Sequence, residues 1–248
     1  MNIPISIQLY TLRNQLENDF KGVLEEVARL GFDGVELAGY SGLTVEEVKS
    51  ILDELNLQVS SSHIPLERFK NELEQVIAEH KLLGCTHLIV PFLMPEERSE
   101  EGYQQLILLL KEVKQVCERE GMTLCYHNHD FEFEKIADGR YALQAILEET
   151  GVEAEFDIYW ITKAGERPVD WLQRYQDRVS LVHLKDMTVD EEQFFAELGT
   201  GGVDIKSVLQ VGEEIGVKWW VVEQDESKID PLESIKISMD YLKKIGVK

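Results

Sequence analysis

The chain has 248 residues, of which 44% are hydrophobic and 29% charged, and its formal net charge is −22. This composition is that of an ordinary globular protein, which argues against disorder. The acidic charge disfavours binding to nucleic acid, because phosphate contacts need clustered Lys and Arg. No apolar run approaches the roughly 20 residues of a membrane span, and the start of the chain lacks the pattern of a secretion signal. We therefore expect a cytoplasmic protein with no membrane or nucleic-acid partner.

The cysteines give no sign of a disulfide framework. Cys85, Cys117 and Cys125 are odd in number and lack CxxC spacing. Such a pattern also argues against a cysteine metal site and predicts buried, free thiols.

A recurring pattern of helix, stop signal and short strand runs along the chain. Residues 20–30 have helical apolar spacing, Gly31 ends that helix, and residues 34–37 read as a strand. Thr44 and Glu47 form a capping box at the start of a helix that ends near Asn56. Counting the β-rich runs at both ends, we expect eight strands near residues 3–9, 34–37, 59–63, 86–90, 123–126, 154–157, 179–184 and 218–222.

Eight strands alternating with helices predict an α/β fold, a single (β/α)8 TIM barrel that spans residues 1–248 as one domain. No GxGxxG motif follows the first strand, and residues 199–202 lack the Lys-Ser/Thr ending of a phosphate-binding loop. A nucleotide cofactor is therefore not expected. The polar stretch 91–102 after the fourth strand fits an active-site loop or a plain surface loop equally well.

Several strands end in polar side chains, which marks the catalytic face of a parallel barrel. The run 180–186, for example, is apolar until His183, Lys185 and Asp186. Carboxylates and a histidine from different strands would form an oxygen and nitrogen ligand set for a divalent cation. The residues that alternation places at or near strand ends are Gln8, Glu36, His63, Asp157, His183, Lys185, Glu223 and Asp225.

Five phrases of the sequence carry a resemblance to a known family. They are residues 30–37 (LGFDGVEL), 126–133 (YHNHDFEF), 157–160 (DIYW), 182–186 (VHLKD) and 222–225 (VEQD). Over nearly the whole chain they resemble the sugar phosphate isomerase/epimerase family, the xylose-isomerase-like TIM barrels. The order of Glu, Asp, His and Glu on successive C-terminal strands is the specific part of this resemblance.

The resemblance implies a metal site. Asp157, His183 and Glu223 match metal ligands from the last three strands, and Glu132 is the candidate for the ligand that follows the fifth strand. His127 and His129 could bind substrate, or one of them could replace the glutamate on the metal. The expected cofactor is a divalent cation, with Mn²⁺ ahead of Mg²⁺, Co²⁺ or Zn²⁺.

The resemblance also implies an activity, that of an isomerase or epimerase acting on a keto sugar through an enediolate. Glu132 and Glu223 would exchange the proton, Lys185 would neutralise oxyanion charge, and His63 would donate to a hydroxyl. An ordinary ion pair is the other interpretation of Lys185. The residues expected to bind substrate are Gln8, Glu36, His127, His129 and Trp160.

Two alternatives remain open at this stage. A lyase or dehydratase of the same superfamily, resembling inosose dehydratases or enzymes that process 3-keto-glycosides, would share the first chemical step. A metal-free, non-catalytic sugar-binding barrel would not need that step. The expected partner is a small sugar, and the sequence leaves open whether the chain forms a homo-oligomer.

Overall fold

A computed structural model describes residues 3–248 and shows a closed barrel of eight parallel strands. Each strand pairs with its neighbours in chain order, and the first strand pairs with the last to close the ring, so the predicted TIM barrel is confirmed. The strands are β1 (Ile5–Gln8), β2 (Gly34–Leu37), β3 (Gln58–His63), β4 (His87–Val90), β5 (Thr123–His127), β6 (Glu153–Asp157), β7 (Val179–Leu184) and β10 (Trp219–Val222).

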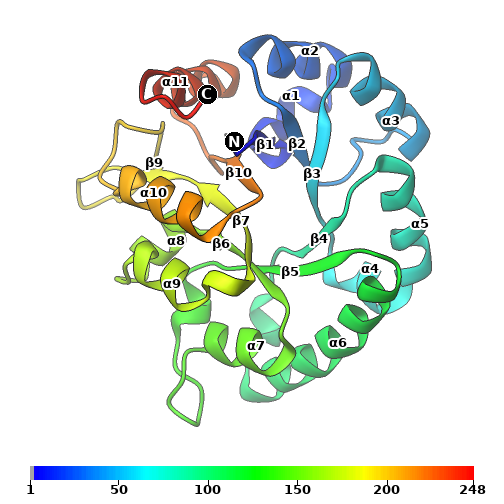
Figure 1. Cartoon of the computed structure of the whole chain (residues 1–248), viewed down its shortest axis with the longest axis vertical. Helices are drawn as coiled ribbons and strands as arrows, with labels where there is room; N and C mark the ends of the chain where they lie inside the picture. The colour runs from blue at the N-terminus through cyan, green and yellow to red at the C-terminus, as the bar shows by residue number, and fades with distance from the viewer. Residues whose placement is uncertain (1–2) are drawn as a thin grey trace.

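Helices form a ring outside the strands, and the last helix lies next to the first ones (Figure 1). The longer helices are α2 (Phe20–Leu30), α3 (Val45–Glu54), α5 (Leu73–Leu83), α6 (Glu100–Arg119), α7 (Ala142–Thr150), α9 (Pro168–Arg174), α10 (Ile205–Ile215) and α11 (Pro231–Lys244). The shorter ones are α1 (Arg13–Leu16), α4 (Leu66–Asn71) and α8 (Ile158–Lys163), with 3-10 turns η1 (Leu9–Leu12), η2 (Pro95–Glu97), η3 (Phe131–Phe133) and η4 (Gln176–Arg178).

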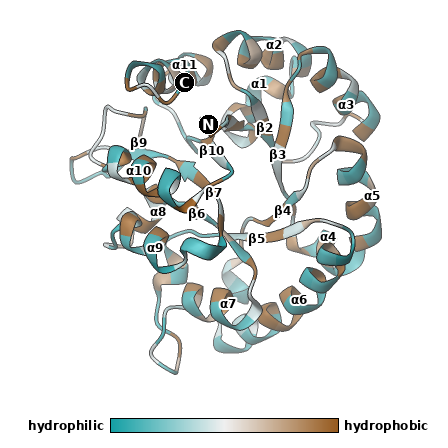
Figure 2. Ribbon diagram, in the orientation of Figure 1, coloured by the Kyte–Doolittle hydropathy of each residue, from teal (hydrophilic) through white to brown (hydrophobic). Residues whose placement is uncertain are grey.

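The helix boundaries follow the local signals in the sequence. The Asp19 side chain accepts a hydrogen bond from the Gly22 backbone at the start of α2, and Gly31 ends that helix with a φ of +95°. The predicted capping box at Thr44 and Glu47 is present at the start of α3. Apolar residues at helical spacing bury one face of each long helix, and Figure 2 shows hydrophobic and hydrophilic residues alternating along the ring.

The barrel interior changes from apolar to polar along the strands. Ile89, Cys125, Leu181 and Val221 form a small buried apolar cluster inside the ring. Polar and charged side chains follow at the C-terminal ends of β2, β3, β6 and β7. All three cysteines are buried and free, as predicted.

Two elements differ from the expected ones. The first strand is shorter than residues 3–9, because the Gln8 side chain accepts a hydrogen bond from the Tyr10 backbone (2.9 Å) and starts a 3-10 turn. A two-stranded antiparallel sheet, β8 (Asp186–Met187) with β9 (Phe195–Ala196), was not predicted. It follows β7, where the buried Asp186 carboxylate accepts hydrogen bonds from the backbone of Met187, Gly199, Gly201 and Val203.

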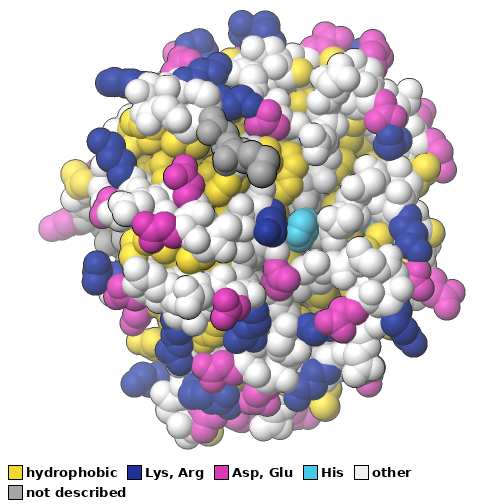
Figure 3. All heavy atoms as spheres, viewed as in Figure 1, with side chains coloured by type: hydrophobic (Ala, Val, Ile, Leu, Met, Phe, Trp, Pro, Cys, Tyr) yellow, Lys and Arg dark blue, Asp and Glu magenta, His cyan; other side chains and the backbone are white. Residues whose placement is uncertain are grey.

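Acidic and basic side chains are interspersed over the face seen in Figure 3. Within residues 3–248, none of the helices combines the length and the apolar character needed to cross a membrane.

Candidate metal centre and cavity

Two buried groups of side chains meet at the C-terminal ends of the strands. The side-chain period of two places Glu155 and Asp157 on one face of β6, with Asp157 one step closer to the barrel mouth. On β7, His183 points inward, and Lys185 follows directly after the strand. Glu223 follows β10 in the same way, so adjacent strands deliver their charged ends to one place.

The outer group consists of His127, Asp157, His183 and Glu223, all buried, whose ligand atoms lie within 4.8 Å of one another. His183 Nδ1 lies 2.8 Å from Glu223 Oε2 and 3.8 Å from Asp157 Oδ2, while His127 Nε2 lies 3.8 Å from that same Asp157 oxygen. Asp157 is held at the start of α8, where its Oδ1 accepts hydrogen bonds from Tyr159 and Trp160 backbone groups. Its buried Oδ2 faces the group and lies 2.9 Å from the Lys185 ammonium.

The inner group lies next to the outer one and contains Glu36, His63 and Glu155. His63 Nε2 lies 2.7 Å from Glu155 Oε2 and 3.1 Å from Glu36 Oε1. Glu36 also accepts hydrogen bonds from Gln8 Nε2 (2.6 Å) and from the Ser61 hydroxyl. Burial alone would lower the pKa of His63, but the two carboxylates raise that pKa to about 10.

Lys185 is buried among carboxylates at the barrel mouth. Its Nζ lies 2.6 Å from Glu223 Oε2, 2.7 Å from Asp225 Oδ2 and 2.9 Å from Asp157 Oδ2. Burial alone would lower the pKa of Lys185, but these three carboxylates hold it well above the ordinary value. The ammonium therefore stays charged, and the ion pair considered from the sequence is present.

The carboxylates of the outer group differ in basicity. Burial raises the pKa of Asp157 to about 6. For Glu223, burial acts in the same direction, but Lys185 and His183 outweigh it and hold the pKa below its ordinary value. Burial lowers the pKa of His127 well below 6.5, so this imidazole is neutral and has a lone pair to offer.

Glu132, the predicted fifth-strand ligand, is not among the residues that the structure brings together. Strand β5 ends at His127, and Glu132 lies beyond it in the turn η3. Its carboxylate accepts hydrogen bonds from the Tyr126 hydroxyl (2.8 Å) and the His129 backbone (2.8 Å). Burial raises its pKa to about 8. His127, at the end of β5, lies in the outer group instead.

A cavity of about 760 Å³ opens above the outer group. His63, His127, His129, Trp160 and Glu223 line it, whereas Gln8 and Glu36 lie below in the barrel, fully buried. Of the residues expected to bind substrate, Gln8 and Glu36 are therefore placed to support His63 and His183 and not to reach the cavity. The buried Trp160 Nε1 has no hydrogen-bond partner, which leaves one donor free at the wall.

Aromatic and basic side chains that no sequence motif indicated form another part of the wall. The Arg98 guanidinium lies over the Phe131 ring (3.5 Å) and near Phe92 (4.8 Å). Phe92 and Arg98 belong to the stretch 91–102, which thus contributes to the cavity. Glu155 was also missed, although its spacing of two from Asp157 is a signal that could have found it.

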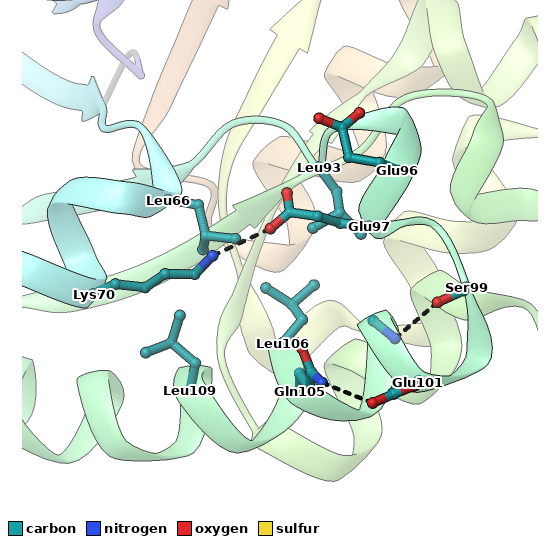
Figure 4. Close-up of a pocket in the computed structure, with 11 residues that line it drawn as sticks. Leu66, Lys70, Leu93, Glu96, Glu97, Ser99, Glu101, Gln105, Leu106 and Leu109 are labelled. Carbon is teal, nitrogen blue, oxygen red and sulfur yellow. Dashed lines mark hydrogen bonds and ion pairs between the residues drawn. The ribbon is translucent and has the colours of Figure 1, made fainter.

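A second, smaller cavity of about 340 Å³ lies away from the outer group, beside α4, η2 and α6. Figure 4 shows Leu66, Leu93, Leu106 and Leu109 on its walls, and the ion pair between Lys70 and Glu97 (3.1 Å) at its edge. None of the residues predicted to act in the site lines this cavity.

The donor set of the outer group fits a divalent cation. Two imidazole nitrogens and two carboxylate oxygens suit Mn²⁺, Co²⁺, Zn²⁺ or Mg²⁺. The burial of two carboxylates supports this fit, because Asp157 and Glu223 repel each other in a site closed to water, and a cation between them would offset that repulsion.

Comparisons with known proteins agree with this architecture. Inosose dehydratase from Clostridium beijerinckii is 24% identical over 267 aligned positions, which cover 92% of this chain and 90% of that protein. A sugar phosphate isomerase/epimerase from Parabacteroides distasonis superposes with a TM-score of 0.85 at 23% identity, covering 100% of this chain and 96% of that one. A probable 3-DHS dehydratase from Bacillus anthracis has a TM-score of 0.76 at 15% identity, covering 97% and 99% of the two chains. Residues 24–245 match the family described as Xylose isomerase-like TIM barrel, and the chain belongs to that family.

Proposed function

We propose that this chain is a divalent-metal-dependent enzyme that removes a proton from the carbon next to a carbonyl of a keto polyol and then eliminates water. The observation that carries this proposal is the outer group, in which His127, Asp157, His183 and Glu223 converge beside Lys185 at the floor of a cavity. A binding protein has little use for two carboxylates, two imidazoles and an ammonium buried together.

The four outer residues would hold the cation. When bound, a divalent cation supplies Lewis-acid polarisation of a carbonyl, which makes the neighbouring C–H more acidic. The remaining steps fall to side chains of this chain.

Of the two outer carboxylates, Glu223 is the one placed to accept the proton, because it lines the cavity and Asp157 does not. The Glu223 carboxylate is ionised at neutral pH. The Lys185 ammonium, 2.6 Å away, would stabilise negative charge on the oxygen of the resulting enolate. Trp160 Nε1 is free to donate a hydrogen bond to a substrate hydroxyl.

Dehydration is the outcome that we favour over the epimerisation expected from the sequence. An epimerase with two carboxylate bases needs one on each face of the substrate, and Glu132 lies outside the group with a pKa of about 8. The similarity to inosose dehydratase along nearly the full length supports the same choice. Epimerisation or isomerisation would use the same first step, with the proton returned in place of the loss of water.

Isotope exchange tests the shared first step. Metal-loaded protein is incubated in D₂O with a panel of inososes and ketohexoses, and each compound is followed by NMR and mass spectrometry. We expect deuterium at the carbon next to the carbonyl, together with loss of 18 mass units from the true substrate. Glu223→Gln should suppress both while keeping the fold, because it retains the shape of the side chain and removes the base.

The products separate the alternatives. If deuterium exchange occurs and an epimer or an isomer is recovered, the enzyme is an epimerase or isomerase, as expected from the sequence, and not a dehydratase. No exchange with any compound, combined with tight binding of one of them, would favour the sugar-binding barrel.

A further inference from the structure

The two imidazoles of the metal centre each face two groups of carboxylates. His183 turns Nδ1 towards Glu223 and Asp157, and Nε2 towards Glu36 (2.7 Å) and Glu155 (3.2 Å). His127 turns Nε2 towards Asp157, and Nδ1 towards Glu155 (3.3 Å). One nitrogen of each ring therefore belongs to the outer group and the other to the inner group.

Glu155 is the residue that both rings share on the inner side. It lies on β6 two residues before Asp157, is fully buried, and does not line the cavity. Its Oε2 lies within reach of His127, His183 and His63, the last at 2.7 Å. A residue in this position cannot touch a substrate in the cavity.

Two atoms at this contact have no hydrogen-bond partner. They are Glu155 Oε1, an acceptor, and His127 Nδ1, and both are buried. An unsatisfied buried polar atom costs free energy. His127 Nδ1 lies 3.3 Å from Glu155 Oε2, so a proton on Nδ1 has a carboxylate acceptor beside it.

We propose that Glu155 is a positioning residue, which orients the His127 imidazole by accepting its Nδ1–H, while Glu36, 2.7 Å from His183 Nε2, holds the second ring. With Nδ1–H of His127 directed at Glu155 and Nε2–H of His183 directed at Glu36, the nitrogens left to bind a cation are His127 Nε2 and His183 Nδ1. Those are the two nitrogens that face Asp157 and Glu223. The inference rests on the proposed metal centre and adds to it a second layer of residues that fixes the ligands.

The inner group is better understood as this supporting layer than as a second cation site. His63, His127, Glu155 and His183 also lie within 4.8 Å of one another. A neutral imidazole has one nitrogen that bears a proton and one that does not. If His127 and His183 bound cations through both nitrogens, both rings would have to lose their last proton. Two buried carboxylates on the inner side are instead suitable acceptors for the N–H groups.

Metal affinity tests the role of Glu155. Binding of Mn²⁺ is measured by calorimetry for the wild-type protein, Glu155→Gln and the matched control Glu153→Gln. Glu153 lies two residues earlier on the same strand and contacts Ser180, not the imidazoles. We expect Mn²⁺ binding to weaken by about 10–100-fold in Glu155→Gln and to stay within about twofold of wild type in Glu153→Gln. Equal affinity in the two variants would overturn the proposal.

The tautomer of His127 provides a second test of the proposal. This measurement uses the wild-type protein without metal. Long-range ¹H–¹⁵N spectra of the metal-free wild-type protein at pH 8 should show His127 protonated on Nδ1. Protonation on Nε2 would overturn the proposal even if Glu155→Gln failed to fold. If the wild-type protein showed the Nδ1–H form but bound no Mn²⁺, the proposed metal centre would fail while the positioning contact stood.

Discussion

Lys185 and Glu223 form an ion pair of 2.6 Å between side chains that are almost entirely buried. Asp157 and Asp225 lie within 2.9 Å of the same ammonium, so one positive charge serves three carboxylates. A cation bound by the outer group would lie close to two of these carboxylates, Asp157 and Glu223. Lys185 and a bound cation therefore act on the same negative charges, and this has a measurable consequence for stability.

We predict that Lys185→Met destabilises the metal-free protein by about 3–5 kcal/mol, because removing one partner leaves buried charges uncompensated. Saturating Mn²⁺ should restore a large part of that loss. Denaturant unfolding with and without the metal measures both. The matched control is Lys206→Met at an exposed position, which should change stability by less than about 0.5 kcal/mol. An unchanged stability in Lys185→Met would contradict the prediction.

A second prediction concerns the ligand at the fifth strand. His127→Ala and His183→Ala should each lose most of the bound metal, because each removes a nitrogen of the outer group. Glu132→Gln should keep the metal, because Glu132 is outside that group and is held by Tyr126 and His129. Elemental analysis after dialysis against Mn²⁺ measures the content. Loss of metal in Glu132→Gln with retention in His127→Ala would restore the original assignment of Glu132.

Glu132 should also make stability depend on pH. Burial raises its pKa from 4.5 to about 8, so the folded state holds a proton that the unfolded state has released. Its contribution to stability is complete below about pH 4.5 and is lost as the pH rises through 8. Glu132→Gln has no such proton. Between pH 5 and pH 8 the unfolding free energy of the wild-type protein should therefore fall relative to that of the variant. Parallel curves for the two proteins would show that Glu132 is ionised in the fold.

We predict that Asp186 stabilises the fold by holding the segment that follows β7. Its two oxygens accept hydrogen bonds from Met187, Gly199, Gly201 and Val203, and the side chain is buried. Asp186→Asn turns an amide group towards two of these donors, and we expect a loss of about 2–4 kcal/mol, since hydrogen bonds to charged groups contribute about 1.5–3 kcal/mol each. Thermal unfolding measures this loss. Asp177→Asn, at an exposed position, should leave the midpoint nearly unchanged.

Local signals in the sequence were enough to predict the barrel. The stop at Gly31, the capping box at Thr44 and the short β-rich runs act within a few residues, and the structure keeps them. Asp157, His183 and Glu223 could also be named, because strand ends in a parallel barrel meet at one face and the order of residue types resembles a known family.

Only the tertiary structure places His127 in the outer group and leaves Glu132 outside it. The period of two holds as far as His127, where β5 ends, and beyond it the direction of a side chain depends on how the chain turns. Contacts with Tyr126 and the His129 backbone hold Glu132 outside the group. The sequence by itself determined the barrel and the residue types at its mouth. The tertiary structure decided which imidazole nitrogen faces which carboxylate, and it buried one lysine among three acids. Both features depend on distances across the closed ring, and no local sequence pattern encodes such distances.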